Sequence, residues 1–186
     1  MNFKGIYNKD KFILKTNKEQ NEYFELLNET FNKDKSTIAE KIQLLNKEAA
    51  KNNIVVIDYL GMLYFGDNTE LETSLYYATC LSLYASANGS KLASSRIRSL
   101  LQPAYNYIMQ NIDRTLLYDI YNLTDKTCDD FIYSHISAVI IFEKQIKIAD
   151  ILEMQNNLSE YSDFNILDLE DLRDDLLNNF VEYLAL

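Results

Sequence analysis

Residues 69–90, TELETSLYYATCLSLYASANGS, carry at their two ends the residue types with which α-helices begin and end. Thr69 and Glu72 have the spacing of a capping box, in which two side chains bond to each other's backbone at a helix N-terminus. Gly89 is the residue type that most readily takes the left-handed conformation with which many helices end. The stretch therefore predicts a helix over residues 70–87.

Small side chains recur at every fourth position inside this predicted helix. Ser74, Ala78, Ser82 and Ser86 lie along one side of it, because residues four apart share a helix face. Such a stripe lets the backbone of a neighbouring helix come close. We interpret it as a packing feature, since the segment is too short and too polar for a dimerisation seam in a membrane.

The composition of the whole chain favours helices as well. Of its 186 residues 47% are hydrophobic, and four Gly and one Pro are too few for a barrel or sandwich of many short strands. We predict an all-α fold, a single-domain helical bundle of about six to eight helices over residues 1–186. Residues 1–15 are predicted to form a short β-hairpin or an extended segment.

Helix caps and apolar periodicity place the other helices. Thr37 and Glu40 form a second capping box, and Pro103 lacks a backbone donor and disfavours helical geometry at the residue before it. The predicted helices are residues 16–31, 36–53, 54–66, 90–101, 103–111, 114–122, 125–156 and an amphipathic acidic terminal helix, 163–186.

The negative charge of the chain is concentrated in its C-terminal part. The net charge is −10, whereas residues 111–186, with 16 acidic and 5 basic residues, carry −11. Residues 1–51 carry +2 and residues 52–110 carry −1. A field of this sign repels nucleic acid, membrane phosphates and nucleotides, and it speeds encounter with cationic proteins. We therefore expect a basic protein, and no nucleic acid, among the partners.

The last stretch combines this charge with an amphipathic pattern. In DLEDLRDDLLNNFVEYLAL, residues 168–186, one broad face is apolar and predicts packing onto the bundle. The opposite face remains available to a cationic partner. Its acids are our candidate partner-binding residues: Asp168, Asp171, Asp175 and Glu182.

The sequence contains no recognisable catalytic or metal-binding motif. The single histidine, His135, has Ile132 three residues before it, so the Glu-x-x-His pair of carboxylate-bridged metal sites is missing. Cys128 precedes His135 by seven residues, roughly 10 Å along a helix and beyond the ~3 Å reach of a catalytic base. We predict no metal, no cofactor and no catalytic residue, and we expect Cys80 and Cys128 to be buried thiols without a disulfide.

The two neighbouring arginines and the single histidine are predicted to stabilise the fold rather than to bind a ligand or catalyse a reaction. Arg96 and Arg98 lie two positions apart, so on a helix they point about 200° away from each other, which favours surface or ion-pair roles over a shared ligand site. His135 is predicted to be a core histidine. Its neighbours on the helix face are apolar: Phe131, Ile132, Val139, Phe142 and Ile146.

The N-terminal residues carry no targeting pattern. Residues 1–15, MNFKGIYNKDKFILK, lack the apolar run of a secretory signal, and no apolar run in the chain is long enough to span a bilayer. We expect a cytoplasmic protein without a membrane span.

These patterns favour a non-enzymatic protein-binding module that neutralises or escorts a basic protein, as an immunity protein, an inhibitor or a secretion chaperone does. The alternative is a subunit of an oligomeric assembly, in which the terminal helix packs against a second copy by self-association. A third hypothesis is an enzyme whose residues converge from distant helices. Its most testable form places Cys80 or Cys128 beside His135.

Overall fold

The computed structural model describes residues 17–66, 71, 74–113, 115, 118–119, 123–161, 174 and 176–178. Throughout these residues the regular elements are helices, which confirms the all-α prediction, while the predicted hairpin lies outside them. The helices are α2 (Asn17–Lys33), α3 (Ile38–Ala49), α4 (Ile54–Phe65), α5 (Leu75–Ala87), α6 (Lys91–Asn111), α8 (Asp125–Glu143), α9 (Ile148–Met154) and the 3-10 helix η1 (Gln155–Tyr161).

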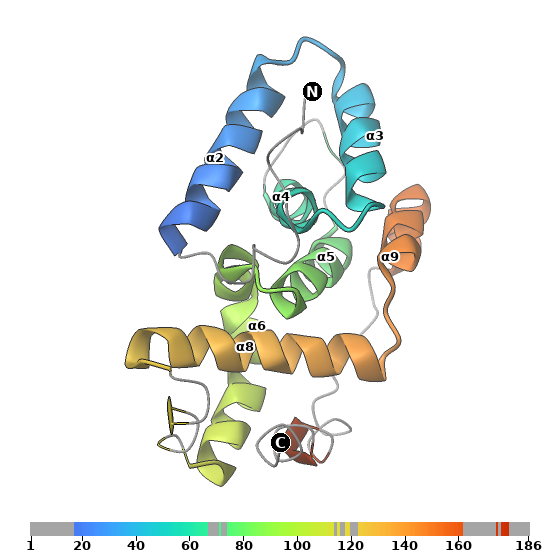
Figure 1. Ribbon diagram of the computed structural model, residues 1–186. Helices are drawn as coiled ribbons and strands as arrows, with labels where there is room; N and C mark the ends of the chain where they lie inside the picture. Colours follow the sequence, from blue (N-terminus) through green and yellow to red (C-terminus); the bar gives the residue numbers. More distant parts are fainter. Residues whose placement is uncertain are drawn as a thin grey trace.

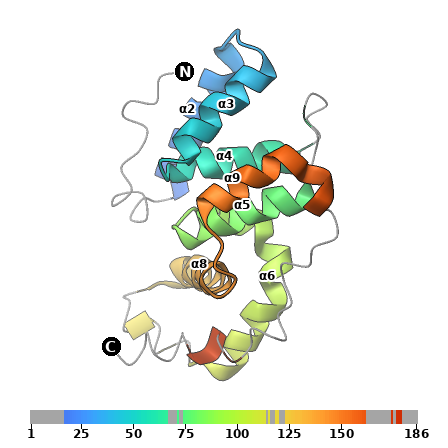
Figure 2. The ribbon, with the colours of Figure 1, turned by 90° about the vertical axis from the view of Figure 1, so that its right-hand side faces the viewer.

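Two buried helices, α4 and α5, form the centre of the bundle. Ten of the 12 residues of α4 and nine of the 13 residues of α5 are buried. A helix that is apolar on all sides has no face suited to water, so it is covered by other elements. Helices α2 and α3 flank α4, α8 crosses against α5 and α6, and α9 packs beside α5 (Figures 1 and 2).

The backbones of α4 and α5 approach closely at a glycine. A Cβ atom added to Gly61 of α4 would lie 2.9 Å from Oγ of Ser82 and 3.5 Å from the carbonyl oxygen of Ala78. Both residues belong to the small-residue stripe predicted along this side of α5. The stripe therefore allows a close helix contact, as its spacing indicated, and α4 is the partner.

The caps explain where several helices begin and end. In α3 the backbone N of Thr37 donates to Glu40 Oε2 at 2.9 Å, and Glu40 N donates to Thr37 Oγ1 at 3.3 Å, so the predicted capping box is confirmed. Gly89 follows α5 with a φ of 91°, the left-handed conformation predicted for it.

Helix α5 begins later than the predicted residue 70. Ser74 is its N-cap, and Ser74 Oγ accepts a hydrogen bond from Tyr77 N at 3.3 Å. Because serine caps a helix as well as threonine does, a second start signal lay five residues after Thr69. The predicted capping box of Thr69 and Glu72 lies outside the described residues.

Pro103 does not end a helix. Helix α6 runs through it from Lys91 to Asn111, so the prediction of separate helices on the two sides is wrong. Proline has no N–H for the carbonyl group four residues earlier, which belongs to Ser99. Ser99 and Pro103 are both exposed, so water can bond to that carbonyl oxygen and the helix continues.

The single helix predicted for residues 125–156 is also wrong, because α8 ends at Glu143 and α9 starts at Ile148. Between them Gln145 has a φ of 50°, and Ile146 N donates to the carbonyl oxygen of Ile141 at 2.9 Å. This is the arrangement of a Schellman-type helix stop, in which glycine usually takes the left-handed position. A glutamine in that position gave no signal in the sequence.

Candidate functional site

The structure describes residues 174 and 176–178 of the acidic terminal stretch, and no other positions in it. The four predicted partner-binding acids lie outside the described residues: Asp168, Asp171, Asp175 and Glu182. Within the same stretch Asp174 is exposed, Leu176 is fully buried, and Leu177 packs partly buried against the core. At these positions the terminal stretch is helical, with one side toward solvent and one side packed.

Exposed acids in the described C-terminal part lie beyond ion-pair distance of the described basic residues. Six of them form no ion pair with any residue whose position the structure describes: Asp113, Asp119, Glu143, Asp150, Glu153 and Asp174. No described ion pair therefore neutralises these six charges, and they contribute to the negative potential of this part of the chain.

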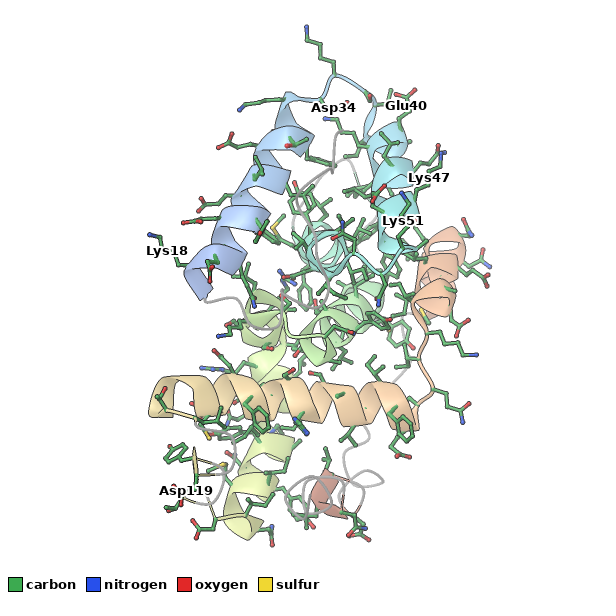
Figure 3. The ribbon with its side chains drawn as sticks, in the orientation of Figure 1. Lys18, Asp34, Glu40, Lys47, Lys51 and Asp119 are labelled. Atoms are coloured by element: carbon green, nitrogen blue, oxygen red, sulfur yellow. The ribbon has the colours of Figure 1, made fainter. Side chains whose placement is uncertain are left out.

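Several acids in the first two described helices have lysine partners instead. Lys33 Nζ lies 2.8 Å from Glu29 Oε2, and Lys51 Nζ lies 2.6 Å from Glu48 Oε1. Figure 3 shows the labelled lysines of α2 and α3 projecting outward among acids of the same half, whereas the labelled Asp119 lies at the opposite end of the molecule. Some acids of the N-terminal part are therefore paired with lysines, unlike the six exposed acids named above.

A buried ion pair joins α4 to α6. Asp58 Oδ1 lies 2.6 Å from Arg96 Nη1, and the two side chains are 2% and 16% exposed. The same Arg96 nitrogen donates to Ser82 Oγ at 3.1 Å, and Ser90 Oγ donates to Asp58 Oδ2 at 2.5 Å. A buried charge is costly unless it is paired and hydrogen-bonded, so this cluster ties α4, α5 and α6 together.

The two arginines point apart, as their spacing predicted. Arg96 enters the bundle toward Asp58, whereas Arg98 is 46% exposed at its side chain and lies 4.9 Å from the ring centroid of Tyr133. The predicted ion-pair role is confirmed for Arg96. The pair does not form a shared ligand site, because the two guanidinium groups lie on different sides of α6.

Serine side chains connect α5, α6 and α8 through a second buried polar chain. Ser86 Oγ lies 2.8 Å from Ser94 Oγ, and Ser137 Oγ donates to Ser86 Oγ at 2.9 Å. Ser134 Oγ donates to the carbonyl oxygen of Ser86 at 2.7 Å. Because each hydroxyl group finds a partner, these small polar residues can be buried in close helix contacts.

A cleft of about 230 Å³ opens where α6 meets α8. Lys91 and Asp130 line it, with Lys91 Nζ 4.0 Å from Asp130 Oδ2, and Arg98 Nη2 lies 3.8 Å from Asp130 Oδ1. Burial raises the pKa of Asp130 although the charges of Lys91 and Arg98 act in the opposite direction. The other lining residues are Gly89, Ser94, Leu123, Phe131 and Ser134. The sequence did not indicate this cleft.

The two thiols are buried in the bundle, and the histidine is partly buried. Cys80 and Cys128 are free and buried, as predicted, and burial raises the pKa of Cys80 to about 12. Burial lowers the pKa of His135, whose ring centroid lies 4.7 Å from that of Phe131. Phe142, which was predicted on the same buried face, is 74% exposed, because α8 ends one residue later and leaves its last turn uncovered.

Buried ionisable groups should make the fold sensitive to alkali. Burial raises the pKa of Cys80 from 9.0 to about 12 and that of Tyr59 from 10.0 to about 12. The unfolded chain therefore loses these protons at lower pH than the folded chain, so the free energy of unfolding falls as pH rises above about 9. Urea unfolding across this range measures the effect. A level profile up to about pH 11 would contradict it, and Cys80→Ala should move the onset toward the ordinary tyrosine pKa of about 10.

Comparisons with known proteins found no similarity. No protein-family model matches the chain, and no curated protein or solved structure matches it. In the described part of the chain, no group of three or more His, Cys, Asp or Glu side chains is placed to hold a metal ion. No described helix has the length and apolar character needed to cross a membrane.

Proposed function

We propose that the chain is a non-enzymatic protein-binding module that engages a basic protein through the acidic surface of residues 111–186. One observation carries this proposal. Exposed acids in this part have no described ion-pair partners, whereas Glu29 and Glu48 in the N-terminal part are paired with lysines. Unpaired surface charge of one sign attracts a partner of the opposite sign and increases the rate of encounter.

The partner is a protein whose exposed surface is rich in lysine or arginine. Binding would cover that surface, which is how an immunity protein or an inhibitor neutralises its target and how a secretion chaperone escorts its cargo. The net charge of −11 over residues 111–186 supports a partner of this class and disfavours nucleic acid.

The burial of Leu176 and Leu177 favours this proposal over self-association through the terminal helix. Leu176 is fully buried and Leu177 is partly buried within a single chain. Apolar area that already packs on its own bundle cannot also drive contact with a second copy. Light scattering at high protein concentration distinguishes the two, since the preferred proposal predicts a monomer.

Neutralising the acidic surface should abolish capture of the partner. We expect the wild-type chain, used as bait in the cells that make it, to retain a basic protein in stoichiometric amount. A variant with Asp168, Asp171 and Asp175 changed to Asn and Glu182 changed to Gln should lose that protein, because the attraction and the polar contacts are removed. Quantitative mass spectrometry of the captured proteins measures the loss.

A matched control removes the same number of charges elsewhere. Its four Glu→Gln changes lie in α2 and α3, at Glu22, Glu25, Glu29 and Glu48. This control should retain the partner like the wild-type chain. Equal retention by all three baits would contradict the proposed surface, and equal loss from both variants would indicate net charge alone rather than a location.

A further inference from the structure

The cleft between α6 and α8 contains two opposite charges that are close but not bonded. Asp130 Oδ2 and Lys91 Nζ are 4.0 Å apart, and the two side chains are 16% and 24% exposed. Direct charge-assisted hydrogen bonds are about 2.7–2.9 Å long, so this distance leaves both groups incompletely satisfied. Neither the Asp130 carboxylate nor the Lys91 ammonium group has a hydrogen bond to another described residue.

A second cation faces the other oxygen of the same carboxylate. Arg98 Nη2 lies 3.8 Å from Asp130 Oδ1, again beyond hydrogen-bond distance, and the Arg98 side chain is 46% exposed. The cleft thus offers a carboxylate acceptor and an ammonium donor, and the guanidinium group of Arg98 lies on the other side of that carboxylate. A ligand that carries both a donor group and an acceptor group would complete the contacts of all three side chains.

The remaining walls combine fixed hydroxyl groups with apolar surface. Ser134 Oγ donates to the carbonyl oxygen of Ser86 at 2.7 Å, and Ser94 Oγ donates to the carbonyl oxygen of Ser90 at 2.9 Å. These bonds hold the two hydroxyl groups in place in the wall of the cleft. Phe131 and Leu123 line it as well and provide an apolar surface for a side chain.

The charges and the size limit the class of ligand. A ligand anion is attracted by Lys91 and Arg98 but meets the carboxylate of Asp130, and a ligand cation is attracted by Asp130 but meets the two basic groups. A zwitterion can place a group of opposite charge against each of them. The volume of about 230 Å³ lies below the range of about 300–1,000 Å³ that is usual for larger ligands.

We propose that this cleft binds a free α-amino acid with an apolar side chain. The ligand ammonium group donates to Asp130, the ligand carboxylate accepts from Lys91 at the Arg98 side of the cleft, and the side chain lies against Phe131 and Leu123. This site shares no residue with the four proposed partner-binding acids, and it does not depend on the proposed function.

Titration with leucine and two of its analogues tests the proposal. Isopentylamine lacks the carboxylate, and 4-methylpentanoate lacks the ammonium group. We expect saturable leucine binding to the full-length chain, followed by NMR shifts or calorimetry, and at least about tenfold weaker binding of each analogue. Asp130→Asn and Lys91→Gln should each weaken leucine binding by a similar factor.

Asp150→Asn is the matched control, because Asp150 is an exposed aspartate on α9. It should bind leucine like the wild-type chain, and thermal unfolding verifies that all variants are folded. Each of three results would overturn the proposal: no saturable binding of leucine up to about 10 mM, equal binding of leucine and isopentylamine, or equal binding of leucine and 4-methylpentanoate.

Discussion

Arg96→Met is expected to lower the free energy of unfolding by about 3–5 kcal/mol. The change removes the guanidinium group 2.6 Å from Asp58 and leaves a carboxylate that is 2% exposed without its counter-ion. It also removes the donor to Ser82 Oγ, which lies on a third helix. Urea denaturation at neutral pH, analysed as a two-state transition, measures the difference.

Two further variants separate the buried charge from other effects. Arg98→Met should cost less than about 1 kcal/mol, because Arg98 is 46% exposed and approaches Asp130 no closer than 3.8 Å. The double variant Asp58→Leu with Arg96→Met should recover much of the lost stability, since a buried ion pair can be replaced by apolar side chains. A loss below about 1 kcal/mol for Arg96→Met alone would show that the pair does not hold the helices together.

Gly61→Val is expected to lower the free energy of unfolding by about 3 kcal/mol, at the upper end of the usual cost of overpacking. Its Cβ atom alone would lie 2.9 Å from Ser82 Oγ and 3.4 Å from Leu81 Cβ, and two methyl groups would follow. Ser82 cannot easily move away, because Arg96 donates a hydrogen bond to it. Helices α4 and α5 would have to separate, which loosens the centre of the bundle.

Gly66→Val provides the control for that change. Gly66 follows α4 in an extended conformation with φ −88° and ψ 164°, and a Cβ atom there would meet a carbonyl oxygen at an ordinary 3.5 Å. Valine suits extended backbone, so the change should stay within about 0.5 kcal/mol. Similar urea midpoints for the two valine variants would contradict the close packing of α4 and α5.

Much of the fold could be predicted from local signals, because those signals act locally in the structure. Thr37 and Glu40 cap α3 as their spacing indicated, and Gly89 ends α5 in the left-handed conformation. The helix boundaries that were predicted wrongly depend on solvent exposure and on an unusual backbone conformation, which local sequence patterns do not indicate. Pro103 is tolerated inside α6 because its face is exposed, and Gln145 takes a position where glycine is usual.

The contacts that polar side chains make between different helices could not be predicted from the sequence. Asp58 is the one acidic residue in the apolar run IVVIDYLGMLYF, residues 54–65, and a lone acid in such a run is a signal of a buried, partnered carboxylate. Its partner, Arg96, lies 38 residues away, and no local pattern connects the two. The cleft at Asp130 depends likewise on how α6 crosses α8, which spacing within one helix does not determine.

Buried charges and surface charges have separate roles in this protein. Asp58 and Arg96 neutralise each other inside the bundle, so they contribute to stability and not to the outer potential. Exposed acids such as Asp150, Glu153 and Asp174 contribute to the outer potential. Substitutions at the surface should therefore change binding with little effect on folding, whereas Arg96→Met should act through the fold.

The most direct test of the acidic binding surface is the association rate constant with the captured partner, measured at increasing ionic strength. For the wild-type chain and for the control variant in α2 and α3, the rate should be high at low salt and fall steeply as salt screens the charges. For the variant that lacks the charges of Asp168, Asp171, Asp175 and Glu182, the rate should be low and nearly independent of salt. The same steep dependence in all three proteins would contradict the account, because the attraction would then come from another part of the molecule.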